Sequence, residues 1–346
     1  DIPIPSSSSL KPHEVLIKVA VAGYCHTEKM TAVGDFKAML KGRDLPLVPS
    51  HEPTGVVVAL GSEAASEKSS PATGGKGPLQ VGDRVGSLAF KDFCGECPDC
   101  KSGRPKYCDA SEAVGLSVDG GFAEYCVVDY RSSVKLPDSL DFASAAPLMC
   151  AGATMASAIK GCNLQAGQHL TIIGAGALGH IGCSLAKAQG LKVSMIDSRE
   201  PPLELCRKLK WAPDYTFNAK DISDPSDGEQ IAKVLEAIGG SAPDATIVAT
   251  DVIPAFTLGI WLTKKHGQLQ VVGQPSDPIQ IPFFPLIFRD LRVTGSLLAD
   301  QVTLKELVDL VAEKGIEVRT IEYGLQEVPK LLSDYAKPGH AGKLVV

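Results

Sequence analysis

The sequence predicts an α/β protein that combines a doubly wound parallel sheet with a second, β-rich domain. Between residues 150 and 290, short apolar runs alternate with segments of helical spacing, as strands and helices alternate in a parallel sheet. Residues 1 to about 150 lack this alternation. Short runs rich in Val and Ile are separated there by Gly, Pro and Asp, which indicates a barrel-like β domain.

Composition excludes several classes of function. The 346 residues are 44% hydrophobic and 21% charged, with a formal net charge of −6. This acidic balance offers no basic surface for nucleic acid or an anionic membrane, and no apolar run is long enough to span a bilayer. We expect no secretory signal, and the ten cysteines favour metal binding over disulfides. We expect a cytoplasmic protein with a small-molecule substrate.

The N-terminal part contains predicted strands at residues 15–21, 55–60 and 125–128, where β-branched residues are frequent. Residues 61–78 are rich in Ser, Ala, Gly and Lys, and they offer almost no side chain to bury. We therefore expect a flexible insertion on the surface.

A glycine-rich turn within residues 170–190 is the motif around which the chain is organised. An apolar run stops at a glycine, and helical spacing begins three residues later. In a Rossmann-type turn the first glycine permits the bend, the second lets the backbone approach a pyrophosphate, and the third lets helix pack on strand. The phosphates then lie at the helix N-terminus. The expected cofactor-binding residues are Gly174, Gly176, Ala177, Leu178 and Gly179.

The next apolar run ends in Asp197, eighteen residues after Gly179. An acidic residue at the tip of the second strand can bind a ribose 2′-hydroxyl and would repel a 2′-phosphate. This pattern predicts NAD as the cofactor. The alternative is an ordinary strand–helix turn in which the glycines serve packing alone.

Further elements complete the predicted sheet. Helices are expected near residues 203–209 and 229–238, and strands at 246–249, 269–272 and near Val293. Thr303 and Glu306 form a possible capping box at the start of a later helix. We assign residues 150–290 to the dinucleotide-binding domain, and residues 1–149 and 291–346 to the other domain.

Four cysteines lie within fifteen residues, in the pattern C-x2-C-x2-C-x7-C. Four thiolates at this spacing can close a tetrahedral zinc site, which has no open position and is therefore structural. An iron–sulfur cluster or two disulfides are the alternatives, but no other feature suggests electron transfer. The expected ligands are Cys94, Cys97, Cys100 and Cys108.

The remaining cysteines are ambiguous by themselves. Cys25 ends an apolar run, Cys150 lies where the two predicted domains meet, and His51 precedes Glu52 between two prolines. A lone buried cysteine is usually a small apolar core residue. We assign that role to Cys126, Cys162, Cys183 and Cys206, which lie inside apolar periodic segments.

Several ordered motifs resemble those of the zinc-dependent medium-chain alcohol dehydrogenases. They are GYCHTE, SHEPTG, the cysteine run, DGGFAEY, AAPLMCAG, GAGALGH and the terminal GKLVV, and together they span nearly the whole chain. The resemblance implies a GroES-like catalytic domain and two zinc ions per chain. It implies that NAD-dependent hydride transfer interconverts an alcohol with an aldehyde or ketone. It also suggests a homo-oligomer, with a tetramer favoured over a dimer.

The same resemblance implies roles for individual residues. Two cysteines and one histidine would bind the catalytic zinc, in agreement with the ligand set known for alcohol dehydrogenase. Thr27 would touch the substrate oxygen, His26 would lie near the cofactor phosphates, and Glu28 would accept the second ring N–H of the zinc-bound histidine. The full implied set is Cys25, His51 and Cys150 as zinc ligands, Glu52 as a transient neighbour of the metal, and Lys343 at the pyrophosphate.

Three departures from the family pattern concern the active site. Met30 stands where a relay histidine is common, and Phe36 and Ala89 stand where large tryptophans often narrow the substrate pocket. We therefore expect primary or secondary alcohols larger than ethanol. The alternatives are a polyol or other specialised-alcohol dehydrogenase of the same family, and a relative that binds cofactor without turnover.

Overall fold

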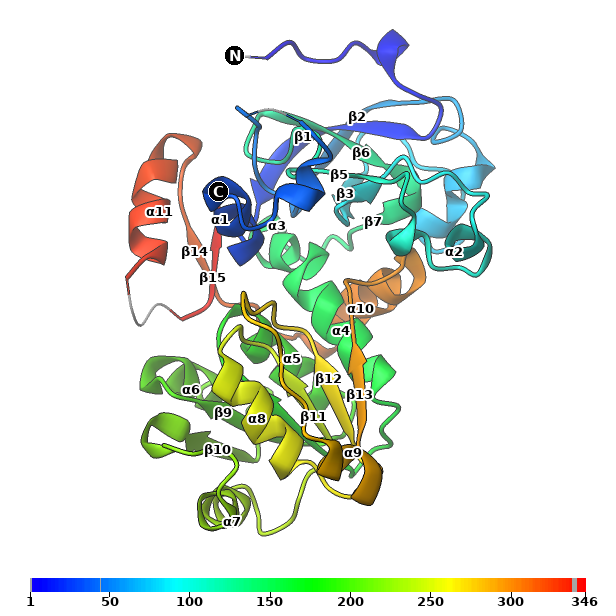
Figure 1. Cartoon of the computed structure of the whole chain (residues 1–346). Coiled ribbons are helices and arrows are strands. Elements are labelled where there is room, and N and C mark those ends of the chain that lie inside the picture. Colours follow the sequence, from blue (N-terminus) through cyan, green and yellow to red (C-terminus); the bar gives the residue numbers. More distant parts are fainter. Residues whose placement is uncertain (1, 44, 338–340) are drawn as a thin grey trace.

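The computed structural model describes residues 2–43, 45–337 and 341–346. The chain forms two parts that Figure 1 shows one above the other. The upper part contains an antiparallel sheet and both chain ends, and the lower part contains a parallel sheet with helices around it. This arrangement confirms the predicted α/β class with a second, β-rich domain.

The antiparallel sheet has the strand order β6-β1-β2-β3-β7. Val15 and Ile17 of β1 pack with Val57, Val85 and Val128 from the neighbouring strands in one buried cluster. The alternation of these side chains explains why the N-terminal runs form strands rather than helices. The strands are β1 (Glu14–Ala22), β2 (Pro53–Leu60), β3 (Arg84–Ser87), β6 (Tyr125–Asp129) and β7 (Ser133–Lys135), and a separate pair joins β4 (Phe90–Lys91) to β5 (Glu112–Ala113).

The expectation of a flexible insertion at residues 61–78 is wrong. The segment forms the 3-10 helix η3 (Glu67–Thr73), and Ala64 and Ala72 are fully buried against the cluster of the antiparallel sheet. The Ser69 hydroxyl accepts a hydrogen bond from the backbone N–H of Leu79 at 2.8 Å. Small side chains therefore suffice to pack this segment, because they let its backbone approach the sheet closely.

The parallel sheet has the order β10-β9-β8-β11-β12-β13, so the direction of winding reverses between β8 and β11. β13 pairs in parallel with β12, and the sheet therefore continues beyond the expected domain boundary at residue 290. The strands are β8 (His169–Ile173), β9 (Lys192–Asp197), β10 (Tyr215–Asn218), β11 (Ala245–Val248), β12 (Gln268–Val271) and β13 (Arg292–Gly295).

Both faces of this sheet are buried. Ile172 and Met195 pack in one cluster, with helices on that face, while the next residues, Ile173 and Ile196, pack in a second cluster on the other face. This burial on both faces explains why the strands are continuous apolar runs. The first face is covered by α4 (Ala151–Gly161), α5 (Ala177–Ala188), α6 (Glu200–Arg207) and α10 (Gln301–Lys314), and the second by α7 (Gly228–Ala237) and α8 (Ile253–Leu262).

The glycines of the β8–α5 turn have different structural tasks. Gly174 has a φ of 105°, a conformation that glycine adopts without a side-chain clash. A Cβ atom on Gly179 would lie 1.9 Å from the carbonyl oxygen of Gly174, so the helix can approach the strand only because Gly179 has no side chain. Gly179 therefore supports the turn by packing.

The start of α10 differs from the expected capping box. Asp300 is the N-cap, and its carboxylate accepts a hydrogen bond of 2.7 Å from the backbone N–H of Thr303. Aspartate is a strong N-cap residue, so it displaces the threonine from that task. The remaining elements are α1 (His26–Val33), α2 (Pro98–Lys101), α3 (Phe142–Ala145), α9 (Phe283–Phe288), α11 (Val328–Tyr335), β14 (Thr320–Glu322) and β15 (Lys343–Val345).

Among the described residues, no single helix has the length and apolar character of a membrane span, although the bent pair Phe142–Met149 and Ala151–Gly161 meets that test by length and composition. The C-terminal strand β15 returns to the upper part, where the backbone N–H of Tyr24 donates to the carbonyl of Leu344 at 2.9 Å. Figure 1 shows β15 beside α1. The end of the chain therefore contributes to the site at Cys25.

A buried histidine should make folding sensitive to acid. His180 in α5 contacts the carbonyl of Gly176 (3.0 Å) through Nδ1, and its Nε2 accepts from the backbone N–H of Arg319 (3.3 Å). Burial lowers the pKa of His180 from 6.5 to about 4. The unfolded chain therefore takes up a proton first as pH falls, and stability is lost from about pH 6.5 downward, reaching about 3 kcal/mol near pH 4.

Urea unfolding of wild type and His180→Gln between pH 7 and pH 4 measures this effect. The variant should lose less stability over that range than wild type, whatever its stability at pH 7. Equal losses in the two proteins would show that His180 does not account for the acid sensitivity.

Candidate active site and cofactor cleft

Three segments that are far apart in the sequence bring Cys25, His51 and Cys150 together. Cys25 precedes α1, His51 precedes β2, and Cys150 directly precedes α4. The Sγ atoms of Cys25 and Cys150 are 4.0 Å apart, and His51 Nε2 is 3.2 Å from Cys150 Sγ. Together with a carboxylate oxygen of Glu52, these atoms all lie within 4.8 Å of one another.

The buried carboxylate of Glu28 orients two of these side chains. Glu28 Oε1 accepts hydrogen bonds from Nδ1 of His51 (2.5 Å) and from its backbone N–H (3.2 Å). Glu28 Oε2 accepts from the backbone N–H of Cys25 at 2.8 Å. Glu28 engages Nδ1, so Nε2 is the ring nitrogen that faces the thiols, and in the neutral ring Nε2 can bind a metal. A carboxylate behind the ring is the usual support of a metal-binding histidine.

The chemistry of the donor set fits a catalytic zinc ion. The hydrogen bond from the Cys150 thiol lowers the pKa of Cys25 well below its usual value, although burial opposes the shift. The thiolate is the form of cysteine that binds metal. Two sulfurs and one imidazole nitrogen suit zinc, and three protein ligands leave one coordination position open.

Glu52 and Lys343 form a buried ion pair beside this donor set. Glu52 Oε1 lies 2.5 Å from Lys343 Nζ, and both side chains are almost completely buried. Burial raises the pKa of Glu52 to about 7, although the Lys343 ammonium opposes the shift. Within the described part of the chain, Glu52 Oε2 has no hydrogen-bond partner. A cation at the donor set would lie close to the Glu52 carboxylate.

Thr27 and His26 lie at the start of α1. Thr27 Oγ1 is 3.7 Å from Cys25 Sγ. His26 Nδ1 is 2.9 Å from the Tyr335 hydroxyl, and its Nε2 is 3.5 Å from Asp251 Oδ2 in the loop after β11. His26 therefore connects the two parts of the protein. Sequence reasoning missed Tyr335 and Asp251 because neither lies in a recognisable motif.

Two cavities follow the carboxyl ends of the parallel strands, where dinucleotides bind in this type of sheet. The first has a volume of about 270 Å³ and the second about 420 Å³. Of the expected cofactor residues, the first cavity is lined by His26, Gly176, Ala177, Leu178 and Lys343, and the second by Gly174 and Asp197. Gly179 lines neither of the two.

Asp197 is held by several donors at the tip of β9. Its carboxylate accepts from the backbone N–H groups of Ala175 (2.8 Å) and Arg199 (2.9 Å). The Arg199 guanidinium also reaches it, with Nε at 3.1 Å and Nη2 at 3.2 Å. The expected ribose-binding acid therefore lies beside a cation. Whether the site accepts a cofactor with a ribose 2′-hydroxyl or one with a 2′-phosphate depends on the pair of Asp197 and Arg199.

A third cavity of about 310 Å³ opens on the other side of the donor set. Phe36 and Ala89, the expected pocket residues, both line it. It shares lining residues with the first cofactor cavity, so the two spaces meet at the donor set. The shared residues are Thr27, Cys150, Thr154, Val272 and Gln274.

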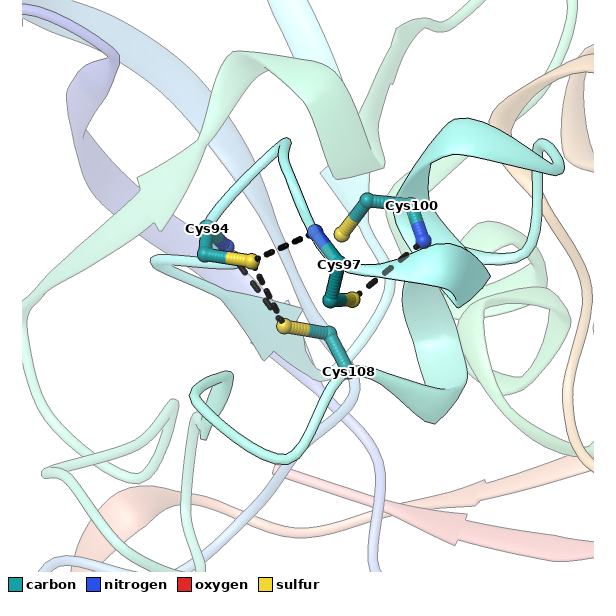
Figure 2. Close-up of side chains that lie close together, drawn as sticks. All are labelled: Cys94, Cys97, Cys100 and Cys108. Atoms are coloured by element: carbon teal, nitrogen blue, oxygen red, sulfur yellow. Dashed lines mark hydrogen bonds between the residues drawn. The ribbon is translucent and has the colours of Figure 1, made fainter.

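The four clustered cysteines form a separate centre in the upper part. Figure 2 shows Cys94, Cys97, Cys100 and Cys108 with their sulfurs turned toward a common point, and these sulfurs lie within 4.8 Å of one another. Backbone N–H groups of Cys97 and Cys100 donate to the sulfurs of Cys94 and Cys97 at 3.3 and 3.4 Å. Such hydrogen bonds stabilise thiolates. Four sulfur donors without an open position fit a structural zinc.

Comparison with known proteins agrees with this geometry. The description "Alcohol dehydrogenase GroES-like domain" matches residues 11–138, and "Zinc-binding dehydrogenase" matches residues 177–313. The chain belongs to the zinc-dependent medium-chain alcohol dehydrogenase family. This alcohol dehydrogenase is thus an oxidoreductase with a GroES-like domain and a Rossmann-type domain.

The similarity to individual proteins extends over nearly the whole chain. An alcohol dehydrogenase of Geobacillus stearothermophilus is 32% identical over 96% of this chain and 91% of its own length. The NADP-dependent alcohol dehydrogenase C 1 of Mycolicibacterium smegmatis is 33% identical over 90% of this chain and 85% of its own. The crystal structure of the Aeropyrum pernix alcohol dehydrogenase has a TM-score of 0.85 and 26% identity, over 100% of this chain and 95% of its own.

The two donor sets should respond differently to loss of one cysteine. Cys97→Ser should remove one zinc ion and lower the melting temperature, because a closed site contributes directly to folding. Cys150→Ser should remove the other zinc ion and abolish turnover, while much of the fold remains.

Metal analysis combined with thermal unfolding and an activity assay tests this expectation. Cys162→Ala is the control, since Cys162 is buried outside both sites and should keep both ions. One zinc ion or none in active wild-type protein, or iron in place of zinc, would contradict the assignment.

Proposed function

We propose that this dehydrogenase catalyses reversible hydride transfer between NAD and a primary or secondary alcohol. The observation that supports the proposal most strongly is the meeting of two cavities at Cys25, His51, Cys150 and Thr27. One cavity is shaped by the dinucleotide turn, and the other is walled mainly by apolar side chains. A nicotinamide in the first would face an alcohol carbon in the second.

Each residue of the site then has a chemical task. Cys25, His51 and Cys150 would hold zinc, which when bound acts as a Lewis acid and makes an alcohol easier to deprotonate. Thr27 Oγ1 would accept the alcohol proton and pass it onward. Met30 cannot carry a proton, so the proton would leave through His26 or through water.

Nicotinamide absorbance with a panel of alcohols and ketones tests this proposal, with Cys150→Ser as the inactive control. Turnover restricted to polyols would support the specialised-alcohol alternative. Binding of cofactor without turnover of any alcohol or carbonyl compound would contradict the proposal and support a non-catalytic relative.

We further propose a cytoplasmic homo-oligomer, with a tetramer favoured. Helix α9 supports the oligomer, because Phe283, Ile287 and Phe288 are each more than 60% exposed beside the edge strand β13. Exposed apolar patches and open sheet edges are common at subunit interfaces. None of the ten cysteines forms a disulfide, which fits a reducing compartment.

We expect NAD to be used more efficiently than NADP, by about tenfold or more. The carboxylate of Asp197 is almost buried, and a 2′-phosphate beside it would meet like-charge repulsion. Asp197→Ser should lower the ratio of the efficiency with NAD to the efficiency with NADP. Steady-state kinetics with each cofactor measure both effects.

The opposing influence is Arg199, whose guanidinium could bind a 2′-phosphate, and a relative in Mycolicibacterium smegmatis is NADP-dependent. Arg199→Ala is therefore the paired variant, and it should lower any residual NADP activity. Equal or better efficiency with NADP in wild type would show that Arg199 outweighs Asp197.

Substrate size should follow from the wall of the third cavity. Ala89 is 2% exposed, and its small side chain leaves space that an apolar substituent can fill. Each buried methylene is worth about 0.8 kcal/mol, or roughly fourfold in efficiency. We expect efficiency to rise from ethanol toward longer, branched or aryl alcohols, and Ala89→Trp should reverse this order.

Phe36→Ala is the complementary variant, because it should extend the preference to bulkier substrates. Measured kcat/KM values along a series of alcohols of increasing size test whether Phe36 and Ala89 limit substrate size. Wild-type protein that is fastest on ethanol, together with no effect of Ala89→Trp, would contradict the pocket assignment and leave the zinc chemistry standing.

A further inference from the structure

The substrate cavity contains a cation that the proposed hydride transfer does not require. Lys106 lines the cavity together with the apolar walls and the donor set. It is half-buried, in the 3-10 helix η4 (Pro105–Tyr107) of the cysteine lobe.

The positive charge of the Lys106 ammonium has no carboxylate partner among the described residues. Its hydrogen-bond acceptor is the carbonyl of Leu298, at 3.4 Å, and the ring of Tyr107 lies 5.6 Å from Nζ. Among the described residues, no carboxylate lies within ion-pair distance of Nζ, including Asp109 on the cavity wall and Asp300. A partly buried ammonium without a counter-ion gains from an anion placed beside it. Lys106 could therefore bind an anionic group of a ligand.

A second lysine on the same cavity wall is already bound. Lys41 Nζ donates to the carbonyl of Asp109 at 2.7 Å and to the carbonyl of Ser111. These hydrogen bonds connect Lys41 to the backbone of the loop that follows the cysteine cluster. Lys41 thus uses two of its three N–H donors on the protein backbone, whereas the ammonium of Lys106 has one carbonyl acceptor, at 3.4 Å, and keeps more donors for a ligand.

The cysteine lobe fixes where Lys106 lies. Cys108 follows η4 directly and is 4% exposed, and its Sγ lies 3.7 Å from Cys94 Sγ. The backbone N–H of Cys108 donates to the carbonyl of Pro105 at 3.0 Å. The lysine is therefore held on a short segment anchored by the cluster, which gives the lobe a part in the substrate pocket.

We propose that Lys106 is a specificity-determining residue that binds a carboxylate at the far end of the substrate, so that the enzyme prefers ω-oxo and ω-hydroxy acids to neutral analogues. The inference rests on the proposed function, and it names the substrate class of the same site. One ammonium matches the single charge of a carboxylate. Lys106 and the donor set line the same cavity, and the apolar side chains that also line it suit the methylene chain of such a substrate.

Efficiencies with 5-oxopentanoate and 6-oxohexanoate, each compared with its neutral amide, test the proposal. Wild type should prefer the acid of one or both lengths by about tenfold to a hundredfold, the size expected for a hydrogen bond to a charged partner. Lys106→Gln should remove this preference by raising KM for the acid, with activity on the amide retained. Lys106→Arg should restore much of it.

Lys101→Gln is the matched control, because it removes the same charge from the exposed surface of the same lobe. It should leave the acid-to-amide ratio unchanged. Equal efficiencies for acid and amide in wild type, or a preference that survives Lys106→Gln, would overturn the inference while turnover of the amides upholds the proposed function.

If no aldehyde is turned over, the proposed function is contradicted. Calorimetry then tests separately whether Lys106 binds a carboxylate. The zinc-loaded protein should bind 6-hydroxyhexanoate more tightly than 6-hydroxyhexanamide, and Lys106→Gln should abolish the difference. Equal binding of the two compounds to wild type, or tighter acid binding that persists in the variant, would overturn the role of Lys106.

Discussion

The buried carboxylate of Glu28 is the constraint on which the arrangement of the site depends. It binds the backbone of Cys25 and both the backbone and the ring of His51, so one side chain fixes two segments that are distant in sequence. A buried carboxylate is costly unless its acceptors are used. Because three donors satisfy it, the carboxylate supports a fixed position of the imidazole, and Cys150 completes the donor set from the start of α4.

The two parts of the protein meet around this donor set. β15 passes beside α1 and brings Lys343 to Glu52, while His26 faces Asp251 from the loop after β11. The parallel sheet is buried on both faces, and its carboxyl edge lines the candidate cofactor cleft. The site therefore combines fixed ligands from one part with a fixed cofactor edge from the other.

Much of this architecture could be predicted from local sequence. The glycine turn and the alternating apolar runs depend on neighbouring residues, and both are present as expected. The cysteine cluster was predictable because its ligands lie within fifteen residues. By contrast, no spacing rule could bring Cys25, His51 and Cys150 together, and that part depended on the order of family motifs.

The errors of sequence reasoning concern features that depend on distant contacts. The small side chains of Ala64 and Ala72 gave no apolar signal, yet they pack against the antiparallel sheet. Asp300 is the cap of α10 and accepts from the backbone N–H of Thr303, so the helix begins before the residue that was expected to cap it. The pairing of Glu52 with Lys343 joins residues 291 positions apart, and the exposure of Lys106 to the substrate cavity depends on the folded lobe.

The central claim is that each chain holds one closed and one open zinc centre. X-ray absorption at the zinc edge tests this claim most directly. Four sulfur ligands at one centre and two at the other predict an average of about three sulfurs per zinc ion, together with a contribution from imidazole. In Cys150→Ser the average should rise to about four as the imidazole contribution disappears. An average of four sulfurs in fully active wild type, without imidazole, would contradict the account.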